Sequence, residues 1–151
     1  MIRQTIGKIW KKLPHSLRTL AVRTTQARFT ISAAAVVVND GGEVLLLNHV
    51  LRPRSGWGFP GGFLDAGEQP ADAIKREVFE ETGIELNSLI LYSVRTTKRH
   101  MEIIFLARSS GEAKVSSREI YELGWFAADK LPHGVTRAQE SLIREVLRPE
   151  I

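Results

Sequence analysis

The chain has no cysteine among its 151 residues. This absence excludes a disulfide framework, a thiolate metal site and a cysteine nucleophile. No apolar run approaches the roughly 20 residues that a membrane-spanning helix needs, and the longest, residues 31–38, has the length and β-branched content of a strand. The N-terminus has basic residues but lacks the continuous apolar core of a secretory signal. These absences predict a cytoplasmic protein.

Acidic residues are missing from the first 39 positions, which hold seven basic residues: Arg3, Lys8, Lys11, Lys12, Arg18, Arg23 and Arg28. The rest of the chain contains 14 of the 21 Lys and Arg residues and all 17 Asp and Glu residues. It therefore carries a net charge of −3, although the whole chain carries +4. Because the positive charge is local, it does not by itself indicate a nucleic-acid-binding surface on the remainder.

Residues 1–28 are interpreted as a basic amphipathic helical extension. Apolar residues recur there at helical spacing and Pro14 interrupts them, which predicts two short helices. Such a segment can lie on an anionic membrane or a phosphate backbone, or it can pack against its own domain or a second subunit. We favour packing of the extension against its own domain or a second subunit, rather than binding to a membrane surface. A homodimer formed partly by the extension is an open alternative.

Residues 29–151 are long enough for one domain with one core. Turn residues 39–42 separate strand-like residues 29–38 and 44–47, which predicts a hairpin. Further strands are predicted at 85–94, 101–107 and 122–127, with a polar loop at 95–100. Helices are predicted at 70–82, between Pro70 and the terminator Gly83, and at 137–147. This order of elements predicts a mixed α/β sandwich.

Three glutamates share one edge of the first of these helices. Glu77 and Glu81 are four residues apart and lie on one face, and Glu80 lies beside them. A bare cluster of this kind is more often a solvated acidic face. The glycines at 61, 62 and 67 predict a loop that can approach a ligand closely, and Gly83 ends the helix directly after the acids. Because oxygen ligands suit hard cations such as Mg²⁺, this context favours a metal site.

The segment from residue 62 to 84 resembles the Nudix box: a glycine, five residues, a glutamate, seven residues, then R-E-U-x-E-E-x-G-U with U apolar. The matching positions are Gly62, Glu68, Arg76, Glu77, Val78, Glu80, Glu81, Gly83 and Ile84. Nine constrained positions within 23 residues make chance agreement very rare. Residues 57–60, 125–126 and 131–132 are also similar to that family, so the resemblance extends from about residue 29 to 147.

The resemblance implies an α/β/α sandwich with a mixed β-sheet and a catalytic loop-helix-loop, so that residues 29–151 form a Nudix hydrolase domain. It also implies Mg²⁺ or Mn²⁺ as cofactor. Phosphoanhydride cleavage requires charge neutralisation on the phosphoryl oxygens and an activated nucleophile, and a carboxylate-bound metal can supply both. The expected reaction is hydrolysis of a pyrophosphate bond in a nucleotide-like substrate.

By position in the box, Glu77, Glu80 and Glu81 are implied as metal ligands, with the Gly61 carbonyl as a candidate further ligand. Glu77 is also a candidate for orienting the attacking water. Arg76 is expected to pair with Glu68 and to fix the loop on the helix rather than to act in the chemistry itself.

Two departures from the family pattern affect the expected ligands. Asp65 stands where glutamate is more usual, and its side chain is one methylene shorter, which puts a role for it in the loop or metal shell in doubt. Family members also often recruit a further acid from a later loop, and Glu119 is the first candidate here, with Glu122 second.

Residues outside the box are the candidates for substrate binding. The stretch 48–58 contains Arg52, Arg54 and Trp57, and the stretch 95–100 contains Arg95 and His100. Guanidinium groups can clamp diphosphates, and tryptophan or histidine can stack on a base. Each of these residues taken singly is also common on any protein surface.

Downstream residues typical of ADP-ribose, diadenosine polyphosphate and NADH hydrolases are missing. We therefore expect a nucleoside diphosphate derivative or a nucleoside triphosphate as substrate. An RNA 5′-end pyrophosphohydrolase that uses the basic extension to bind phosphates is one alternative. A non-catalytic nucleotide sensor is another, disfavoured because every expected catalytic carboxylate is present.

Overall fold

The computed structural model of the chain describes residues 2–52 and 56–148. The chain separates into two compact units, residues 1–30 and residues 31–151. The first unit consists of α1 (Ile2–Lys12) and α2 (His15–Thr25), so the two predicted helices are confirmed. Pro14 directly precedes α2, a position where its missing N–H is tolerated. Among the described residues, no helix combines the length and apolarity needed to cross a membrane.

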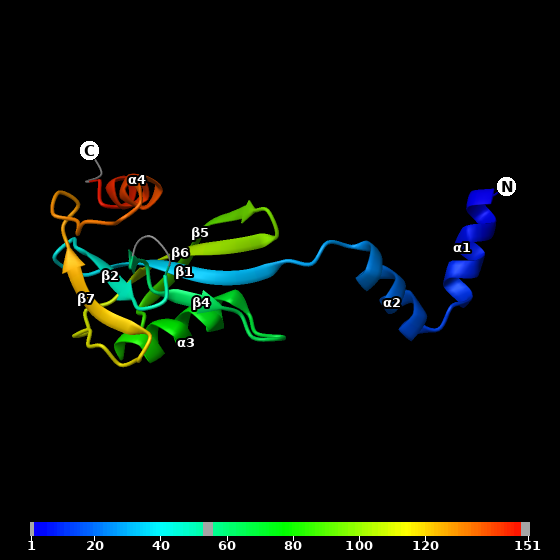
Figure 1. Cartoon of the computed structure of the whole chain (residues 1–151), viewed down its shortest axis with the longest axis horizontal. Helices are drawn as coiled ribbons and strands as arrows, with labels where there is room; N and C mark the ends of the chain where they lie inside the picture. The colour runs from blue at the N-terminus through cyan, green and yellow to red at the C-terminus, as the bar shows by residue number, and fades with distance from the viewer. Residues whose placement is uncertain (1, 53–55, 149–151) are drawn as a thin grey trace. The chain divides into compact units, whose positions relative to one another are not determined.

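The second unit is built around one sheet, whose strand order is β3-β2-β1-β6-β5, with β4 paired to β1 and β7 paired to β2 (Figure 1). The strands in the described residues are β1 (Thr30–Val38), β2 (Val44–His49), β3 (Trp57–Gly58), β4 (Gly61–Phe63), β5 (Ser88–Thr97), β6 (His100–Arg108) and β7 (Ile120–Phe126). The long predicted strands are all present, with ends shifted by a few residues.

The sheet contains both strand directions. β1 is antiparallel to β2 and to β4, and β5 is antiparallel to β6. Near the first residues of β1 and β6, the Ser32 Oγ lies 3.1 Å from the His100 Nε2, and beyond their last residues the Ser109 N–H donates to the Val38 carbonyl. β1 and β6 therefore run in the same direction, and the expected mixed sheet is confirmed.

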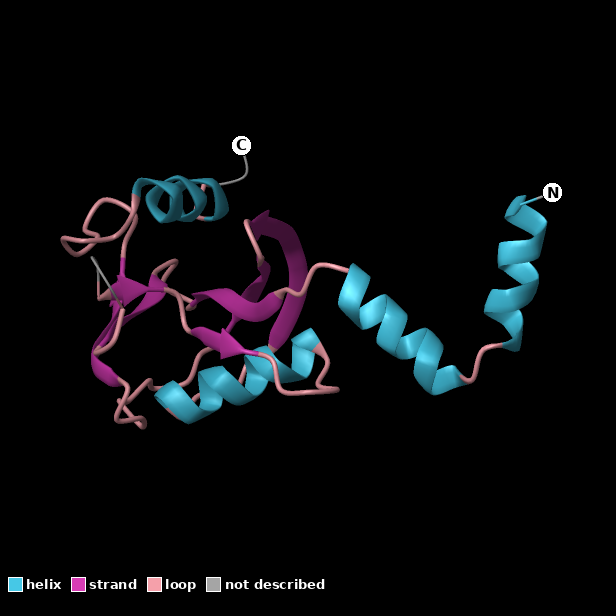
Figure 2. Ribbon diagram, turned by 45° about the vertical axis from the view of Figure 1, so that its right-hand side comes forward, coloured by secondary structure: helices cyan, strands magenta, loops and turns pink. Residues whose placement is uncertain are grey.

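Helices cover both faces of this sheet. Residues 33, 35 and 37 of β1 pack in one core cluster with Ile74 and Val78 of α3 (Pro70–Thr82). Residues 34 and 36 pack in a second cluster with Leu142 and Ile143 of α4 (Arg137–Val146). Because successive strand residues point to opposite faces, β1 is buried on both sides. Figures 1 and 2 show α3 and α4 on opposite sides of the sheet, which confirms the α/β/α sandwich.

Both helices of this unit have identifiable start or stop signals. Pro70 occupies the first turn of α3, and Gly83 ends the helix in the left-handed conformation with a φ of 73°. The predicted bounds of α3 are therefore correct. At the start of α4 the Thr136 and Gln139 side chains form a reciprocal capping box.

The predicted polar loop at residues 95–100 is wrong. β5 continues to Thr97, β6 begins at His100, and these two residues are register partners. The turn between them is closed with Lys98 at a φ of 54°. Threonine is β-branched and favours a strand, which explains how a polar sequence continues the ladder. Arg95 and His100 are consequently held on strands.

The predicted glycine loop is also partly a strand. Gly61 and Gly62 lie in β4 and pair with Ala34 and Ala33 of β1. A Cβ atom on Gly61 would come within 2.2 Å of the Ala33 carbonyl oxygen, so only glycine permits this close pairing. The glycines therefore fix a rigid edge beside α3.

Candidate active site

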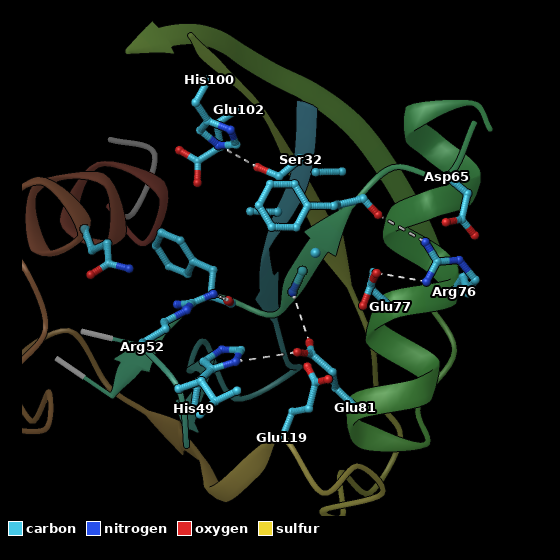
Figure 3. Close-up of a pocket in the computed structure, with 18 of the residues that line it drawn as sticks. Ser32, His49, Arg52, Asp65, Arg76, Glu77, Glu81, His100, Glu102 and Glu119 are labelled. Atoms are coloured by element: carbon cyan, nitrogen blue, oxygen red, sulfur yellow. Dashed lines mark hydrogen bonds and ion pairs between the residues drawn. The ribbon is translucent and has the colours of Figure 1, made fainter. Parts of the chain in front are cut away.

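A cavity of about 600 Å³ opens between the sheet and α3, and Figure 3 shows the side chains that line it. Its walls come from β1, β2 and the residues after it, β4, α3, the β5–β6 hairpin, the segment before β7 and the start of α4. The side chains that line it include Ser32, His49, Arg52, Phe59, Phe63, Asp65, Arg76, Glu77, Glu81, Arg95, His100, Glu102, Glu119 and Gln139.

Glu81 is the most enclosed acid of the cavity, with 5% of its surface exposed. The Gly61 backbone N–H donates to its Oε2 at 3.0 Å. This hydrogen bond joins the end of α3 to β4, so the position of the carboxylate depends on both elements. Glu81 faces the cavity beside Glu119 (Figure 3).

Burial raises the pKa of Glu81 to about 7. The Gly61 hydrogen bond opposes this rise, the neighbouring Glu77 adds to it, Arg52 opposes it and Glu119 adds to it. Removal from water and two nearby like charges both disfavour the ionised form. The ionised cluster therefore needs a positive charge beside it.

His49, at the end of β2, lies next to Glu81 in the cavity wall. Its Nδ1 is 3.7 Å from the Glu81 Oε1, and its side chain is 10% exposed. Burial, followed by the charge of Arg52, lowers the pKa of His49 to about 4. The imidazole is consequently neutral at pH 7 and does not supply the missing positive charge.

Arg76 binds several groups at the loop-helix junction. Its Nε and one terminal nitrogen donate to the two Glu68 carboxylate oxygens at 2.8 and 2.9 Å, so the predicted pair is confirmed. The other terminal nitrogen donates to Glu77 at 2.8 Å and to Glu80 at 3.3 Å. A further contact of 3.3 Å reaches the Phe63 carbonyl. These bonds lower the pKa of Glu68 to about 2 and raise that of Arg76.

The described residues contain no group of three side chains already arranged around a metal position. One reason is that Glu77 and Glu80 both accept from Arg76, and the Glu80 side chain is 57% exposed. Glu77, Glu81 and Glu119 line the cavity, whereas Glu80 and Glu122 are not among its lining residues. Glu77 and Glu119 both disfavour the ionised form of the buried Glu81 carboxylate, and these oxygen donors together fit a hard divalent cation.

The substrate-binding residues predicted in the stretch 48–58 differ in their surroundings. Arg52 lines the cavity and donates to the Phe59 carbonyl at 3.1 Å, and burial lowers its pKa while Glu81 and Glu102 raise it. Trp57 packs edge-on against Phe126 at 5.2 Å in the core cluster under α4, and the cavity lining does not include it. Arg54 lies outside the described residues.

The predicted substrate residues of the second stretch both line the cavity. Two nitrogens of Arg95 contact the Glu102 Oε2 at 2.6 Å. The His100 Nε2 lies 3.1 Å from the Ser32 Oγ, and its ring meets Phe63 edge-on at 5.8 Å. Asp65, the departure from the family pattern, lies at the loop edge of the same cavity and donates its N–H to Glu68 at 2.9 Å.

Four residues that line the cavity, Ser32, His49, Phe63 and Glu102, were not among the predicted site residues. For Glu102 a signal was present, since residues two apart on a strand share a face and His100 was already a candidate. Ser32 enters the cavity because β1 lies beside β6, an arrangement of distant segments that a local pattern does not contain. His49 becomes notable only through its burial against Glu81.

Comparison with known proteins agrees with this geometry. The family model described as NUDIX domain matches residues 28–146. A MutT-like protein of Streptomyces ambofaciens is 31% identical over 72% of this chain and 70% of its own. The NAD-capped RNA hydrolase NudC of Haemophilus influenzae is 33% identical over 82% of this chain and 51% of its own. The mouse 8-oxo-dGDP phosphatase NUDT18 is 33% identical over 65% of this chain and 32% of its own.

Solved structures show the same similarity. The crystal structure of a MutT NUDIX hydrolase from Burkholderia pseudomallei is 35% identical and covers 80% of this chain and 98% of its own, with a TM-score of 0.68. A NUDIX hydrolase from Nitrosomonas europaea, at 19% identity and a TM-score of 0.70, supports the fold alone.

The chain therefore belongs to the Nudix family. It is an enzyme of the Nudix hydrolase class, which acts on phosphoanhydride bonds. The matched segment spans about half the length of the NudC relative and about a third of the NUDT18 relative, so the activities of those whole proteins stay with them.

Proposed function

We propose that this chain hydrolyses a pyrophosphate bond in a nucleoside diphosphate derivative or a nucleoside triphosphate, with Mg²⁺ or Mn²⁺ as cofactor. The observation that carries the proposal is one cavity with two chemically different ends. Glu77, Glu81 and Glu119 lie at one end and His100 lies at the other (Figure 3), and the Phe63 ring packs edge-on against His100 at 5.8 Å. A charged phosphate chain and an aromatic base require such a division.

Glu77, Glu81 and Glu119 are the cavity residues that would hold the metal, and the family resemblance adds Glu80 and the Gly61 carbonyl to that set. When bound, the divalent ion supplies charge neutralisation for the phosphoryl oxygens and an activated water. The Glu81 carboxylate must be ionised to act as a ligand, so its raised pKa predicts weaker metal binding below about pH 7.

Arg52 is one of three arginines that line the cavity, and the other two, Arg76 and Arg95, form ion pairs with carboxylates. Arg52 is held by the Phe59 carbonyl and feels the charges of both Glu81 and Glu102. A partly buried guanidinium offers several donors to phosphate oxygens and retains its charge at any working pH. We assign Arg52 the role of binding the phosphate chain and orienting it toward the acidic end.

Arg76 and Glu68 have a positioning role in this proposal. Their bidentate pair fixes the loop after β4 on α3, and the same arginine aligns Glu77. The site can depend on this pair even if neither side chain touches the substrate.

The experiment is turnover of a substrate panel with Mg²⁺, containing nucleoside triphosphates, ADP-ribose, dinucleotides, nucleotide sugars and 5′-triphosphorylated RNA. We expect cleavage of at least one nucleotide at a phosphoanhydride bond, with the products separated by ion-exchange chromatography. Absence of turnover together with measurable nucleotide binding would support a sensor instead.

An RNA 5′ end is a second candidate substrate, favoured by the seven basic residues and missing acids of the first 39 positions. The exposed Lys8, Lys11 and Lys12 lie on α1. Changing all three to Gln should weaken RNA binding and flatten its salt dependence, because fewer counterions are released. Equal RNA binding and an equal salt slope in filter-binding assays would exclude the extension as an RNA-binding segment.

A further inference from the structure

Glu102 occupies a position in the cavity that the pyrophosphate chemistry does not use. Figure 3 places His100 and Glu102 at the end of the cavity away from Glu81 and Glu119. The Glu102 carboxylate is on β6, two residues from His100, and the two side chains therefore point to the same face of the strand. An acid at this end requires an explanation because a phosphate chain would be repelled by it.

Glu102 forms an ion pair with Arg95. Both Arg95 contacts fall on the Glu102 Oε2, so the Oε1 is not engaged by that arginine. A guanidinium has five N–H groups, of which Arg95 uses two in these contacts. Together the two side chains present an acceptor next to a donor, at a cavity wall where 29% of the Glu102 side chain is exposed.

An aromatic surface adjoins this polar pair. Phe63 is 63% exposed although its ring packs edge-on against His100, and it lines the cavity. The Ser32 contact to the His100 Nε2 fixes the orientation of that imidazole. A planar ring placed against Phe63 would therefore lie close to His100, which is two residues from Glu102 on the same face of β6.

The acceptor and donor select among the bases by elementary hydrogen-bond chemistry. An ionised carboxylate accepts hydrogen bonds and donates none. Guanine presents two adjacent donors, N1–H and the 2-amino group, followed by the O6 acceptor. Uracil and thymine flank their single N–H with two carbonyls, and adenine and cytosine place a ring acceptor next to the amino group. Only guanine matches two donors to a carboxylate and an acceptor to a neighbouring guanidinium.

We propose that Glu102 is a specificity-determining residue that selects substrates with a guanine-type base, with Arg95 holding its carboxylate and Phe63 stacking on the ring. The proposal deepens the proposed function and rests on it for the identity of the reaction. Base selection itself is a binding property, so it can be measured without turnover.

The experiment is calorimetric binding of GMP, IMP and UMP, which contain no pyrophosphate bond for the enzyme to cleave. IMP differs from GMP only by loss of the 2-amino group. We expect GMP to bind about tenfold more tightly than IMP or UMP, the discrimination expected for one hydrogen-bonded base edge. The Glu102→Gln variant should lose this preference, because its amide places a donor against the base donors.

Two control variants separate recognition from general damage to the site. Glu112→Gln changes an exposed acid that pairs with Lys114 and should leave all three affinities unchanged. Phe63→Leu should weaken all three by a similar factor, because stacking is tolerant of base identity. A structural role for Glu102 would likewise lower the three affinities together and leave their ratio intact.

Equal binding of GMP and IMP, no binding of either, or an unchanged ratio in Glu102→Gln would each overturn the inference. The turnover panel decides the proposed function separately. Hydrolysis without base selection would reject Glu102 as a specificity residue and retain the reaction class. Base-selective binding without hydrolysis would retain Glu102 as a specificity residue and reject the proposed reaction.

Discussion

Glu81 combines a proposed role as a metal ligand with an environment that disfavours its ionised form. It is buried, it lies near two other acids, and only the Gly61 N–H and the charge of Arg52 favour its ionised form. A group in this position destabilises the metal-free fold when it is ionised, because burial of an incompletely paired charge is unfavourable. Stability and the proposed metal binding therefore place opposite demands on Glu81.

Replacing Glu81 with Gln should stabilise the metal-free protein at pH 8. The folded-state pKa is about 7 against an ordinary value of 4.5, so the carboxylate destabilises the fold above pH 7 and this effect disappears as pH falls toward 4.5. We expect a gain of about 2 kcal/mol in the free energy of unfolding at pH 8, and none near pH 4. Urea unfolding in the presence of a chelator measures it. A variant no more stable than the parent at pH 8 would contradict this account.

The pair of Glu68 and Arg76 should stabilise the protein in the opposite pH direction. The pKa of Glu68 is lowered from 4.5 to about 2, so its contribution is fully present above pH 4.5 and is lost as pH falls through about 2. The Glu68→Gln variant should have a lower Tm than the parent above pH 4.5, and the two values should converge toward pH 2. Thermal unfolding across this range tests it, with Glu112→Gln as a control, and a constant difference would refute the assignment.

The candidate site was predictable where its residues lie within one local segment. The approach of Glu77 and Glu81 to one cavity follows from helical spacing, and the pair of Arg76 with Glu68 follows from the box pattern, whereas Glu80 does not line the cavity. Glu102 was missed because residues 95–100 were predicted as a loop, although His100 and Glu102 share a face of one strand. Ser32 was not found because its approach to the cavity depends on which strands are neighbours. Sheet order joins residues almost 70 positions apart, and no local periodicity encodes it.

At the scale of elements, β4 and α3 form the rigid pair that holds the acids. β4 is only three residues long, yet Gly61 donates to Glu81 and Gly62 lies against Glu77. A Cβ atom on Gly62 would meet the Glu77 carboxyl carbon at 2.4 Å, whereas one on Gly61 would meet backbone atoms of β1. Gly61 therefore permits close pairing of β4 with β1, whereas Gly62 leaves room for the Glu77 carboxylate.

Gly62→Ala should reduce turnover with little effect on folding, since the flexible end of Glu77 can move away from the added methyl group. Gly61→Ala should instead destabilise the fold, because Gly61 has a φ of 144° and its new Cβ would meet the backbone of Ala33. Circular dichroism melting and kcat measured on both variants distinguish these effects. Equal losses of Tm in the two variants would show that Gly62 is structural only.

Element prediction succeeded where the chain carries explicit signals. Pro70 and Gly83 delimit α3 at the residues expected, and the turn cluster at 39–42 separates β1 from β2. β3 and β4 were missed because strands of two and three residues rich in glycine carry no alternation to detect. The predicted strand ended at residue 94, before a polar segment, but the β-branched Thr96 and Thr97 continue β5 to residue 97.

At the scale of the whole chain, the sandwich brings an acidic end and an end with aromatic side chains into one cavity, while residues 1–30 form a unit of their own. The family and the reaction class follow from the box and the fold. The metal, the substrate and the partner of the basic extension are assigned by proposal.

The most direct test of the central proposal is the rate of nucleotide hydrolysis as Mg²⁺ is titrated into metal-free enzyme at pH 8. We predict a saturable Mg²⁺ dependence in the parent protein, a loss of about 10³-fold or more in Glu81→Gln, and a higher Mg²⁺ requirement in Glu119→Gln than in the matched control Glu122→Gln. Hydrolysis that proceeds without a divalent metal, or full activity in Glu81→Gln, would contradict the account.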